Sequence, residues 1–358
     1  MKYFGCNYLE HGLSFELNRL DDCCIFHHDN LGAPTIIENY NGEPIDWDQL
    51  FKIKKEKTEA QKKIGLKECK GCCFLYEKEE SDERYISEIA FSAIKLCNAK
   101  CVYCGDINRI HKKYYDVYPI MVDLVEKGYF KVTDTGLVIF QGGEPTIMNH
   151  FDDLIDLFNK QNANIKVNTS AIRYSKILSD GIENGKIQTC ISLDSGCRET
   201  YKKIKCVDRF DIVVDTIEKY AKAEKKSSKS KLMIKYLIIP GYNDTIEEMD
   251  LFFDKMKELN IKNIVIDVEA NYTAKNQQKN VSPHIHYLMD YAKARAKEEN
   301  IAHEEFSYAY YVRKERQIPY SEELMSDKNM LIKTVNKYRE ENSHKNFQYA
   351  TPVQYFID

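Results

Sequence analysis

The hydrophobic pattern of the chain changes near residue 85. From Tyr85 onward, short runs of β-branched and aliphatic residues alternate with longer segments whose apolar residues recur at helical spacing. The short runs predict six strands, over residues 86–94, 136–140, 165–168, 187–193, 232–239 and 263–268. This alternation predicts a parallel sheet whose strands are joined by right-handed crossovers.

The segments between the strands predict amphipathic helices. Helices are expected over residues 151–158, 210–217 and 246–256, from about 283, and over 329–341. Thr245 and Glu248 have the spacing of a capping box at the start of one of them. The predicted fold class is α/β, as a partial (β/α)6 TIM-type barrel or an open doubly wound sheet. Either fold gathers its ligands at the carboxyl ends of the strands.

Two further regions flank the predicted barrel, which covers residues 85–300. Residues 1–84 are rich in cysteine and include a Lys- and Glu-rich stretch over 52–67 that predicts a solvent-facing helix. Residues 301–358 are polar and rich in tyrosine, and they predict a C-terminal extension with a helix. We therefore expect an N-terminal cysteine-rich extension, the barrel and a helical C-terminal segment.

Composition narrows the classes of function. The 358 residues carry a net charge of -4, so the global charge indicates no nucleic-acid partner. No apolar run approaches the roughly 20 residues of a membrane span, and the N-terminus lacks the pattern of a signal peptide. The expectation is a cytoplasmic protein without a membrane partner. In a reducing cytosol, clusters among its 12 cysteines favour metal binding over disulfides.

Three cysteines follow the first predicted strand closely. Cys97, Cys101 and Cys104 form a Cys-x-x-x-Cys-x-x-Cys motif on one loop. Three thiolates can hold three corners of a [4Fe–4S] cluster, which leaves one iron open to chelate a cofactor through an amine and a carboxylate. The alternatives are structural zinc, which usually takes four ligands in a closed site, and ordinary buried thiols.

A glycine-rich turn follows the second predicted strand. In Gly142-Gly143-Glu144-Pro145, the glycines allow the backbone to approach a ligand closely and the proline fixes the turn. Polar residues lie at the ends of the later strands, where the fold should place its site: Asn168, Ser192, Asp194 and Asn243. Turn formation or helix capping is the alternative role for these four.

With these motifs, residues 85–270 resemble the radical S-adenosylmethionine (SAM) superfamily. The resemblance implies that Cys97, Cys101 and Cys104 bind the catalytic [4Fe–4S] cluster. It also implies contacts with SAM: to the adenine from Tyr103, to the amino group from Gly142, Gly143 and Glu144, and to the ribose, carboxylate or adenine from Asn168, Ser192, Asp194 and Asn243.

The resemblance further implies a reaction. The reduced cluster would pass one electron to the SAM sulfonium, and the resulting 5′-deoxyadenosyl radical would abstract a hydrogen atom from a substrate. The protein would supply placement and exclude water, while the cofactor performs the difficult step. An electron donor such as flavodoxin or ferredoxin is the expected partner.

The early cysteines predict a second metal site. Four ligands could come from Cys6, Cys24, Cys69 and Cys72, with Cys23 and Cys73 as alternates. A second [4Fe–4S] cluster, structural zinc and a redox dithiol all fit these residues. The segment resembles the SPASM or twitch extensions of radical SAM enzymes, which favours the cluster. Those extensions normally follow the barrel, whereas this one precedes it.

The combined prediction is a radical SAM oxidoreductase or maturase-type enzyme. The family resemblance slightly favours a peptide or protein substrate, and the alternative is a dehydrogenase or other modifier of a carbohydrate or small molecule. A competing class is an iron–sulfur or zinc protein that acts as a sensor or scaffold without catalysis.

Overall fold

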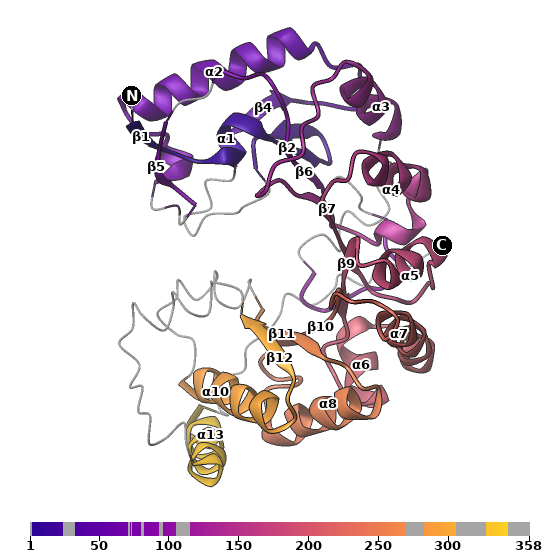
Figure 1. Cartoon of the computed structure of the whole chain (residues 1–358). Coiled ribbons are helices and arrows are strands. Elements are labelled where there is room, and N and C mark those ends of the chain that lie inside the picture. Colours follow the sequence, from indigo (N-terminus) through magenta and orange to yellow (C-terminus); the bar gives the residue numbers. More distant parts are fainter. Residues whose placement is uncertain are drawn as a thin grey trace, which may run out of the picture. The chain divides into compact units, whose positions relative to one another are not determined.

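The computed structural model describes residues 2–23, 33–70, 72, 74–79, 82–92, 96–104, 115–269, 283–305 and 327–342 (Figure 1). The chain forms two compact units. The first contains Met1–Cys97 and Arg109–Asn168, and the second contains Asn98–Asn108 and Thr169–Asp358.

The first unit is built on six strands in the spatial order β8, β7, β6, β2, β3 and β4. Their bounds are β2 Gly12–Glu16, β3 Arg19–Asp21, β4 Thr35–Glu38, β6 Glu88–Phe91, β7 Val138–Phe140 and β8 Ile165–Thr169. The strands from β2 through β6 and β7 to β8 are parallel, whereas β2, β3 and β4 form an antiparallel meander. A separate antiparallel pair joins β1 Lys2–Gly5 to β5 Tyr76–Glu79.

The helices of the first unit are α1 Asn7–His11, α2 Trp47–Lys63, α3 Tyr118–Glu126 and α4 Phe151–Lys160, with short 3-10 turns η1 Lys67–Cys69 and η3 Pro145–Ile147. The long helix α2 packs against α1, β1 and β4 (Figure 1). Asp46 begins α2, because its side chain accepts a hydrogen bond from the Gln49 N–H at 3.1 Å. Aromatic rings fill the core, with the Phe91 ring 4.7 Å from that of Phe140.

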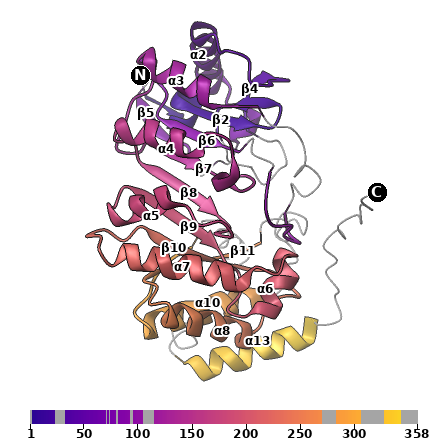
Figure 2. The ribbon, with the colours of Figure 1, turned by 90° about the vertical axis from the view of Figure 1, so that its right-hand side faces the viewer.

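The second unit contains four parallel strands in the order β12, β11, β10 and β9. The strands are β9 Ile187–Ser192, β10 Leu232–Ile238, β11 Asn263–Val268 and β12 Ala302–Glu305. The helices are α5 Lys176–Glu183, α6 Arg198–Lys205, α7 Phe210–Glu224, α8 Ile246–Glu258, α10 Pro283–Glu298 and α13 Lys328–Asn342. Figure 2 shows α13 beside α10, where the rings of Tyr287 and Tyr338 stack with centroids 5.5 Å apart.

The start of α8 shows how local sequence sets an element. The Glu248 N–H donates to the Thr245 Oγ1 at 3.1 Å, so Thr245 is the N-cap that the sequence predicts. The Glu248 carboxylate has a second use, because it accepts from the Thr200 hydroxyl on α6 at 2.6 Å. Behind this cap, Met249, Phe252, Phe253 and Met256 form a buried stripe.

The predicted α/β fold class is confirmed, and all six predicted strands are present within a few residues of their expected bounds. The predicted helices are also present. The stretch over 52–67 is helical only as far as Lys63, where α2 ends, and it buries Lys54, Thr58 and Gln61 among its exposed side chains. The hydrophobic pattern did not predict the five N-terminal strands or β12, which have three to five residues each. The predicted domain boundary between residues 84 and 85 stays a prediction. The strand β2 before it and the strand β6 after it pair in one sheet. Among the described residues, no helix has the length and apolarity to cross a membrane.

Candidate functional site

The glycine-rich turn lies in the first unit at the end of β7. The Gln141 N–H donates to the Phe91 carbonyl at 3.1 Å, and Gly142 then takes a φ of +96°, which glycine adopts without steric cost. The Glu144 N–H donates to the Leu96 carbonyl at 2.8 Å. The turn is therefore tied to the residue directly before Cys97.

Glu144 is only 1% exposed, and part of its carboxylate has a structural use. Its Oε1 accepts from the Thr146 N–H at 3.1 Å and from the Thr146 hydroxyl at 2.7 Å, which caps η3. The implied contact between Glu144 and the SAM amino group stays a prediction. Any such contact would have to share the carboxylate with this cap.

The cysteine loop, residues 97–104, continues into the second unit, where it docks on the end of α6. The Lys100 N–H donates to the Lys205 carbonyl at 3.0 Å, and the Val102 N–H donates to the Ile204 carbonyl at 2.9 Å. The last carbonyls of a helix have no partner within the helix, and here the loop supplies donors for two of them. The Cys104 N–H closes a turn onto the Cys101 carbonyl at 3.0 Å. The loop backbone is therefore anchored on both sides of Cys101.

A buried ion pair fixes the loop side chain that precedes Cys104. Lys205 Nζ lies 2.5 Å from Asp194 Oδ2, and both side chains are at most 2% exposed. The Tyr103 hydroxyl donates to the same carboxylate oxygen at 2.7 Å and accepts from Lys205 Nζ at 3.0 Å. The other oxygen, Oδ1, accepts from the Leu237 N–H at 2.9 Å. Both carboxylate oxygens are thus bonded within the protein.

The electrostatics of this network are those of an ion pair. Burial opposes ionisation of Asp194, but Lys205 and Lys235 together with the Tyr103 hydroxyl outweigh it and lower the pKa of the carboxyl. Burial also works against the charged form of Lys205, yet the charges of Asp194 and Cys101 raise its pKa. Burial and the same two negative groups raise the pKa of Tyr103 well above its ordinary value. Asp194 is therefore ionised, Lys205 protonated and Tyr103 a neutral hydrogen-bond donor.

The other predicted strand-end residues divide into two kinds. Asn243 is fully buried: its Oδ1 accepts from the Ile239 N–H at 2.6 Å, and its Nδ2 donates to the Asp194 carbonyl at 2.8 Å. Asn168 on β8 and Ser192 on β9 are half-buried. Asn243 and Asp194 thus shape the end of β10, while Asn168 and Ser192 keep partial exposure. Contact of any of the four with SAM stays a prediction.

Lys205 is the residue that sequence reasoning missed. It ends a helix in the run Tyr-Lys-Lys-Ile-Lys, where basic residues are expected on the solvent side. One signal was available, because Tyr201, Ile204 and Lys205 share one face at spacings of three and four residues. All three are buried, at 1%, 0% and 2% exposed.

The early cysteines are partly gathered in the first unit. Cys69 is buried, and burial together with the negative charges of Cys6, Cys72, Glu68 and Asp22 raises the pKa of its thiol to about 12. Cys6 and Cys72 therefore lie within electrostatic range of Cys69. The predicted residues Cys24 and Cys73 lie outside the described residues.

Cys97, Cys101 and Cys104 are thiols of partial exposure and form no disulfide. Their chemistry fits an iron–sulfur cluster, whose usual ligands are Cys thiolates. Cys97 belongs to the first unit, and the other two belong to the second. In the part of the chain that the structure describes, no three Cys, His, Asp or Glu side chains are already arranged to hold a metal ion. The ligand set is therefore still a prediction.

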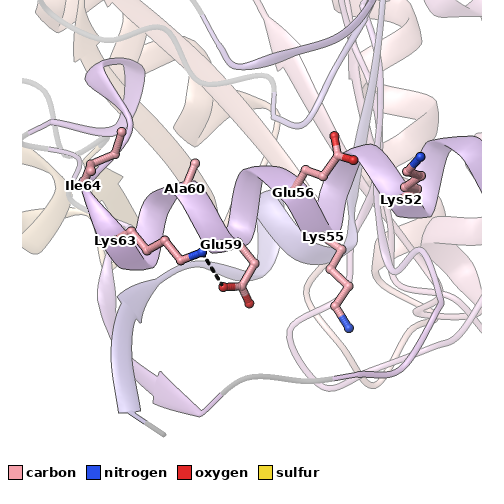
Figure 3. Close-up of a pocket in the computed structure, with 7 residues that line it drawn as sticks. All are labelled: Lys52, Lys55, Glu56, Glu59, Ala60, Lys63 and Ile64. Atoms are coloured by element: carbon pink, nitrogen blue, oxygen red, sulfur yellow. Dashed lines mark ion pairs between the residues drawn. The ribbon is translucent and has the colours of Figure 1, made fainter.

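The first unit also has a hollow on its surface, away from the predicted site residues. Seven residues line it, all from α2 or directly after it: Lys52, Lys55, Glu56, Glu59, Ala60, Lys63 and Ile64 (Figure 3). None of the predicted site residues lines this hollow. Five of these seven residues are charged, whereas ligand pockets are lined mostly by hydrophobic and aromatic side chains.

The chain is similar to known proteins in sequence and in fold. Residues 91–256 match the family model of the radical SAM superfamily. The GTP 3',8-cyclase of Clostridium botulinum strain Okra is 28% identical over 184 residues, which cover 49% of this chain and 54% of that protein. The enzyme of the same name from Clostridium acetobutylicum is 27% identical over 187 residues, which cover 50% and 55%. The chain thus spans about half the length of the curated relatives it matches.

The fold is similar to solved structures of Streptococcus suis SuiB. The SAM-bound form aligns with a TM-score of 0.52 and 16% identity over 78% of this chain and 60% of SuiB. The form bound to the precursor peptide SuiA aligns with a TM-score of 0.51 and 14% identity over 90% and 78%. At this identity the likeness shows a shared fold.

Proposed function

Because residues 91–256 match the family model of the radical SAM superfamily, we propose that this chain cleaves SAM reductively and uses the 5′-deoxyadenosyl radical to abstract a hydrogen atom from a substrate. The observation that carries the proposal is the match of residues 91–256 to the family, since that segment contains the cysteine motif and the glycine-rich turn. The cofactors of the superfamily are a [4Fe–4S] cluster and SAM, and bound together they supply the radical.

The roles of the chain's own residues follow from the geometry. Cys97, Cys101 and Cys104 are the proposed cluster ligands. The ion pair of Asp194 and Lys205 holds the Tyr103 phenol, which limits the positions open to the cysteines on either side of it. Asp194 is in this proposal a positioning residue, because both of its carboxylate oxygens are already bonded within the protein.

Gly142, Gly143, Asn168, Ser192 and Asn243 complete the proposed SAM site. Gly142 and Gly143 leave room for a ligand beside the backbone. Asn168 and Ser192 offer partly exposed polar groups at strand ends. Asn243 acts through the backbone, since it holds the end of β10 in place for a ligand.

The substrate we favour is a peptide or protein. The support is a fold shared with SuiB, whose solved structures include a form bound to the precursor peptide SuiA. A small molecule is the second candidate, because the curated relatives at 27% and 28% identity are GTP 3',8-cyclases. A carbohydrate belongs to this second class. An electron donor of the flavodoxin or ferredoxin type would reduce the cluster.

The test of the chemistry is anaerobic SAM cleavage. Reconstituted protein is mixed with dithionite and SAM, and 5′-deoxyadenosine is measured by mass spectrometry. We expect this product from the native chain and none from the Cys97→Ala, Cys101→Ala, Cys104→Ala triple variant. Cys206→Ser removes an exposed thiol outside the proposed ligand set and should cleave SAM normally.

Two outcomes would contradict the proposal. Cleavage by the triple variant would mean that other residues hold the cluster. Iron-loaded native protein that yields no 5′-deoxyadenosine would instead favour a sensor or scaffold. The substrate class is tested by adding GTP in one arm and short peptides encoded beside the gene in another. The productive arm should show increased 5′-deoxyadenosine together with a mass change in the added molecule.

A further inference from the structure

A second set of thiols lies wholly within the first unit. Cys6 is the N-cap of α1, where its Sγ accepts from the Leu9 N–H at 3.4 Å. Cys69 is the last residue of η1, and the Cys72 N–H donates to the Cys69 carbonyl at 3.0 Å. This bond closes a tight turn that carries both Cys69 and Cys72. Cys6 and Cys69 are buried, at 7% and 6% exposed.

A glutamine of α2 joins the strand before Cys6 to the turn. The Gln61 Nε2 donates to the Phe4 carbonyl at 3.1 Å, and its Oε1 accepts from the Leu66 N–H at 2.7 Å. Phe4 lies two residues before Cys6, and Leu66 lies three residues before Cys69. One buried side chain therefore sets the approach of the two cysteine-bearing segments.

An aromatic contact joins the same two segments after the turn, where Phe74 follows Cys72. The ring of Phe74, two residues after Cys72, meets the ring of Tyr8, two residues after Cys6. The centroids are 5.7 Å apart in an edge-to-face arrangement. Cys6 is thus connected to the turn on both sides of Cys69 and Cys72.

The backbone before Cys23 lies close to α1 at Gly12. A Cβ atom at Gly12 would lie 2.2 Å from the Asp22 carbonyl oxygen and 2.4 Å from the Tyr8 carbonyl oxygen. The backbone leading into Cys23 is therefore packed against α1, the helix that Cys6 begins. Tyr8, Asp22 and Cys23 also line one small cavity.

The charges beside Cys23 are unequal. Lys54 Nζ and Lys57 Nζ each lie 2.6 Å from an oxygen of Asp22. Lys54 and Asp22 are 3% and 1% exposed at the side chain, and Lys57 is 18% exposed. Two ammonium groups thus share one carboxylate in a buried region beside Cys23. Buried charges are normally compensated, so this surplus positive charge favours a negative group nearby.

We propose that Cys6, Cys23, Cys69 and Cys72, the N-terminal thiol group, form a metal centre held by four thiolates. Zn²⁺ and a [4Fe–4S] cluster both take this ligand set, and both are negatively charged once four thiolates bind. On the side of Cys23, that negative charge complements the surplus on Lys54 and Lys57. Among the described side chains no metal site is already closed, so the sulfurs must turn inward around the ion or cluster.

The test uses the full chain with Cys97, Cys101 and Cys104 replaced by Ala, so that any metal left is held elsewhere. Metal and sulfide are counted after anaerobic purification and reconstitution. We expect either about one zinc per chain, or about four irons with matching sulfide and a cluster absorption band. Either result supports the site, and the two identify the metal.

Further variants on this background separate ligation from folding. Cys69→Ser and Cys72→Ser should each lose most of the metal, whereas Cys206→Ser should keep it. Cys6→Ser is the sharpest variant, because a serine oxygen can still cap α1 while it no longer offers a thiolate. It should retain native circular dichroism and lose metal.

Three results would overturn the proposal. The first is a triple variant that folds but holds no stoichiometric metal, either after anaerobic purification or after reconstitution. The second is metal retention in the Cys69→Ser and Cys72→Ser variants. The third is a reversible Cys69–Cys72 disulfide in place of metal, which would indicate a redox dithiol. None of these depends on SAM cleavage, so the site and the proposed function can fail separately.

Discussion

The cysteine loop and the N-terminal thiol group are held in different ways. The cysteine loop has its own backbone anchors, because Lys100 and Val102 bond to the end of α6. The segment of Cys69 and Cys72 is held by short local bonds, such as that from the Cys72 N–H to the Cys69 carbonyl, and by contacts of its neighbours with α1 and α2. We infer that the protein fixes the shape of the cysteine loop in advance, whereas the N-terminal thiol group needs bound metal to complete its structure.

The buried charges beside the two segments also differ, because one group is neutral and the other carries a net positive charge. Asp194 pairs with one lysine, Lys205, so that buried pair is neutral. Asp22 pairs with two lysines, Lys54 and Lys57, so that group carries a surplus positive charge. A neutral pair can serve as a permanent anchor, while a surplus needs a counter-charge from outside the pair. The contrast can be tested one residue at a time.

The largest effect is expected at the neutral pair. Lys205→Met leaves the buried Asp194 carboxylate without its cation, and removal of one partner of a buried pair costs about 3–5 kcal/mol. We expect that loss in the free energy of unfolding, measured by denaturant titration, with a matching fall in reconstituted iron as Tyr103 loosens. Lys202→Met on the same helix is the control, because that lysine is 56% exposed. Equal losses of unfolding free energy in the two variants would show that the ion pair does not anchor the cysteine loop.

A second buried carboxyl in the same unit should respond to pH in the opposite direction from Asp194. Burial raises the pKa of Asp267 on β11 from 3.8 to about 7. The folded chain therefore holds this proton more tightly than the unfolded chain, and its contribution to stability falls as pH rises from about 4 to 7. Asp194, with its lowered pKa, contributes stability that is lost as pH falls.

The measurement is unfolding free energy between pH 5 and 8. Asp267→Asn should remove this residue's share of the decline. At pH 8 the variant should be about 4 kcal/mol more stable than the native protein, on the basis of roughly 1.4 kcal/mol per pKa unit. Unchanged pH dependence in Asp267→Asn would show that this carboxyl is ionised in the fold at neutral pH.

A smaller loss of stability is expected at Asp22 and its two lysines. Lys54→Met removes one cation from Asp22, but Lys57 remains 2.6 Å from the other oxygen. The carboxylate is then still paired, so the loss should be about 1–3 kcal/mol, which is the usual penalty for one unsatisfied buried group. The variant should also weaken metal retention by the N-terminal thiol group. A loss as large as that of Lys205→Met would mean that Lys57 adds little to the pair.

The difference between these two pairs also marks the limit of sequence reading. Six of the strands, β6 to β11, were predictable because β-branched runs and turn residues mark them locally, and the cysteine motif is visible as a spacing. Lys205 and Lys54 were not, because each lies among exposed lysines of the same helix and only packing buries it. The contact of Asp194 with SAM stays a prediction, but the bonds of its carboxylate to Leu237 and Tyr103 could not be read from the sequence.

The smallest predicted effect compares the helix caps of the two units, where local sequence alone should decide the result. Asp46→Ala removes the acceptor for the Gln49 N–H on α2, and Thr245→Ala removes the acceptor for the Glu248 N–H on α8. Each should cost about 1 kcal/mol, because both helices lose one N-cap bond. Hydrogen exchange at the first turn of each helix would measure this locally. A much larger loss for Thr245→Ala would show that the cap also orients Glu248 toward Thr200 on α6, and so supports the helix end on which the cysteine loop docks.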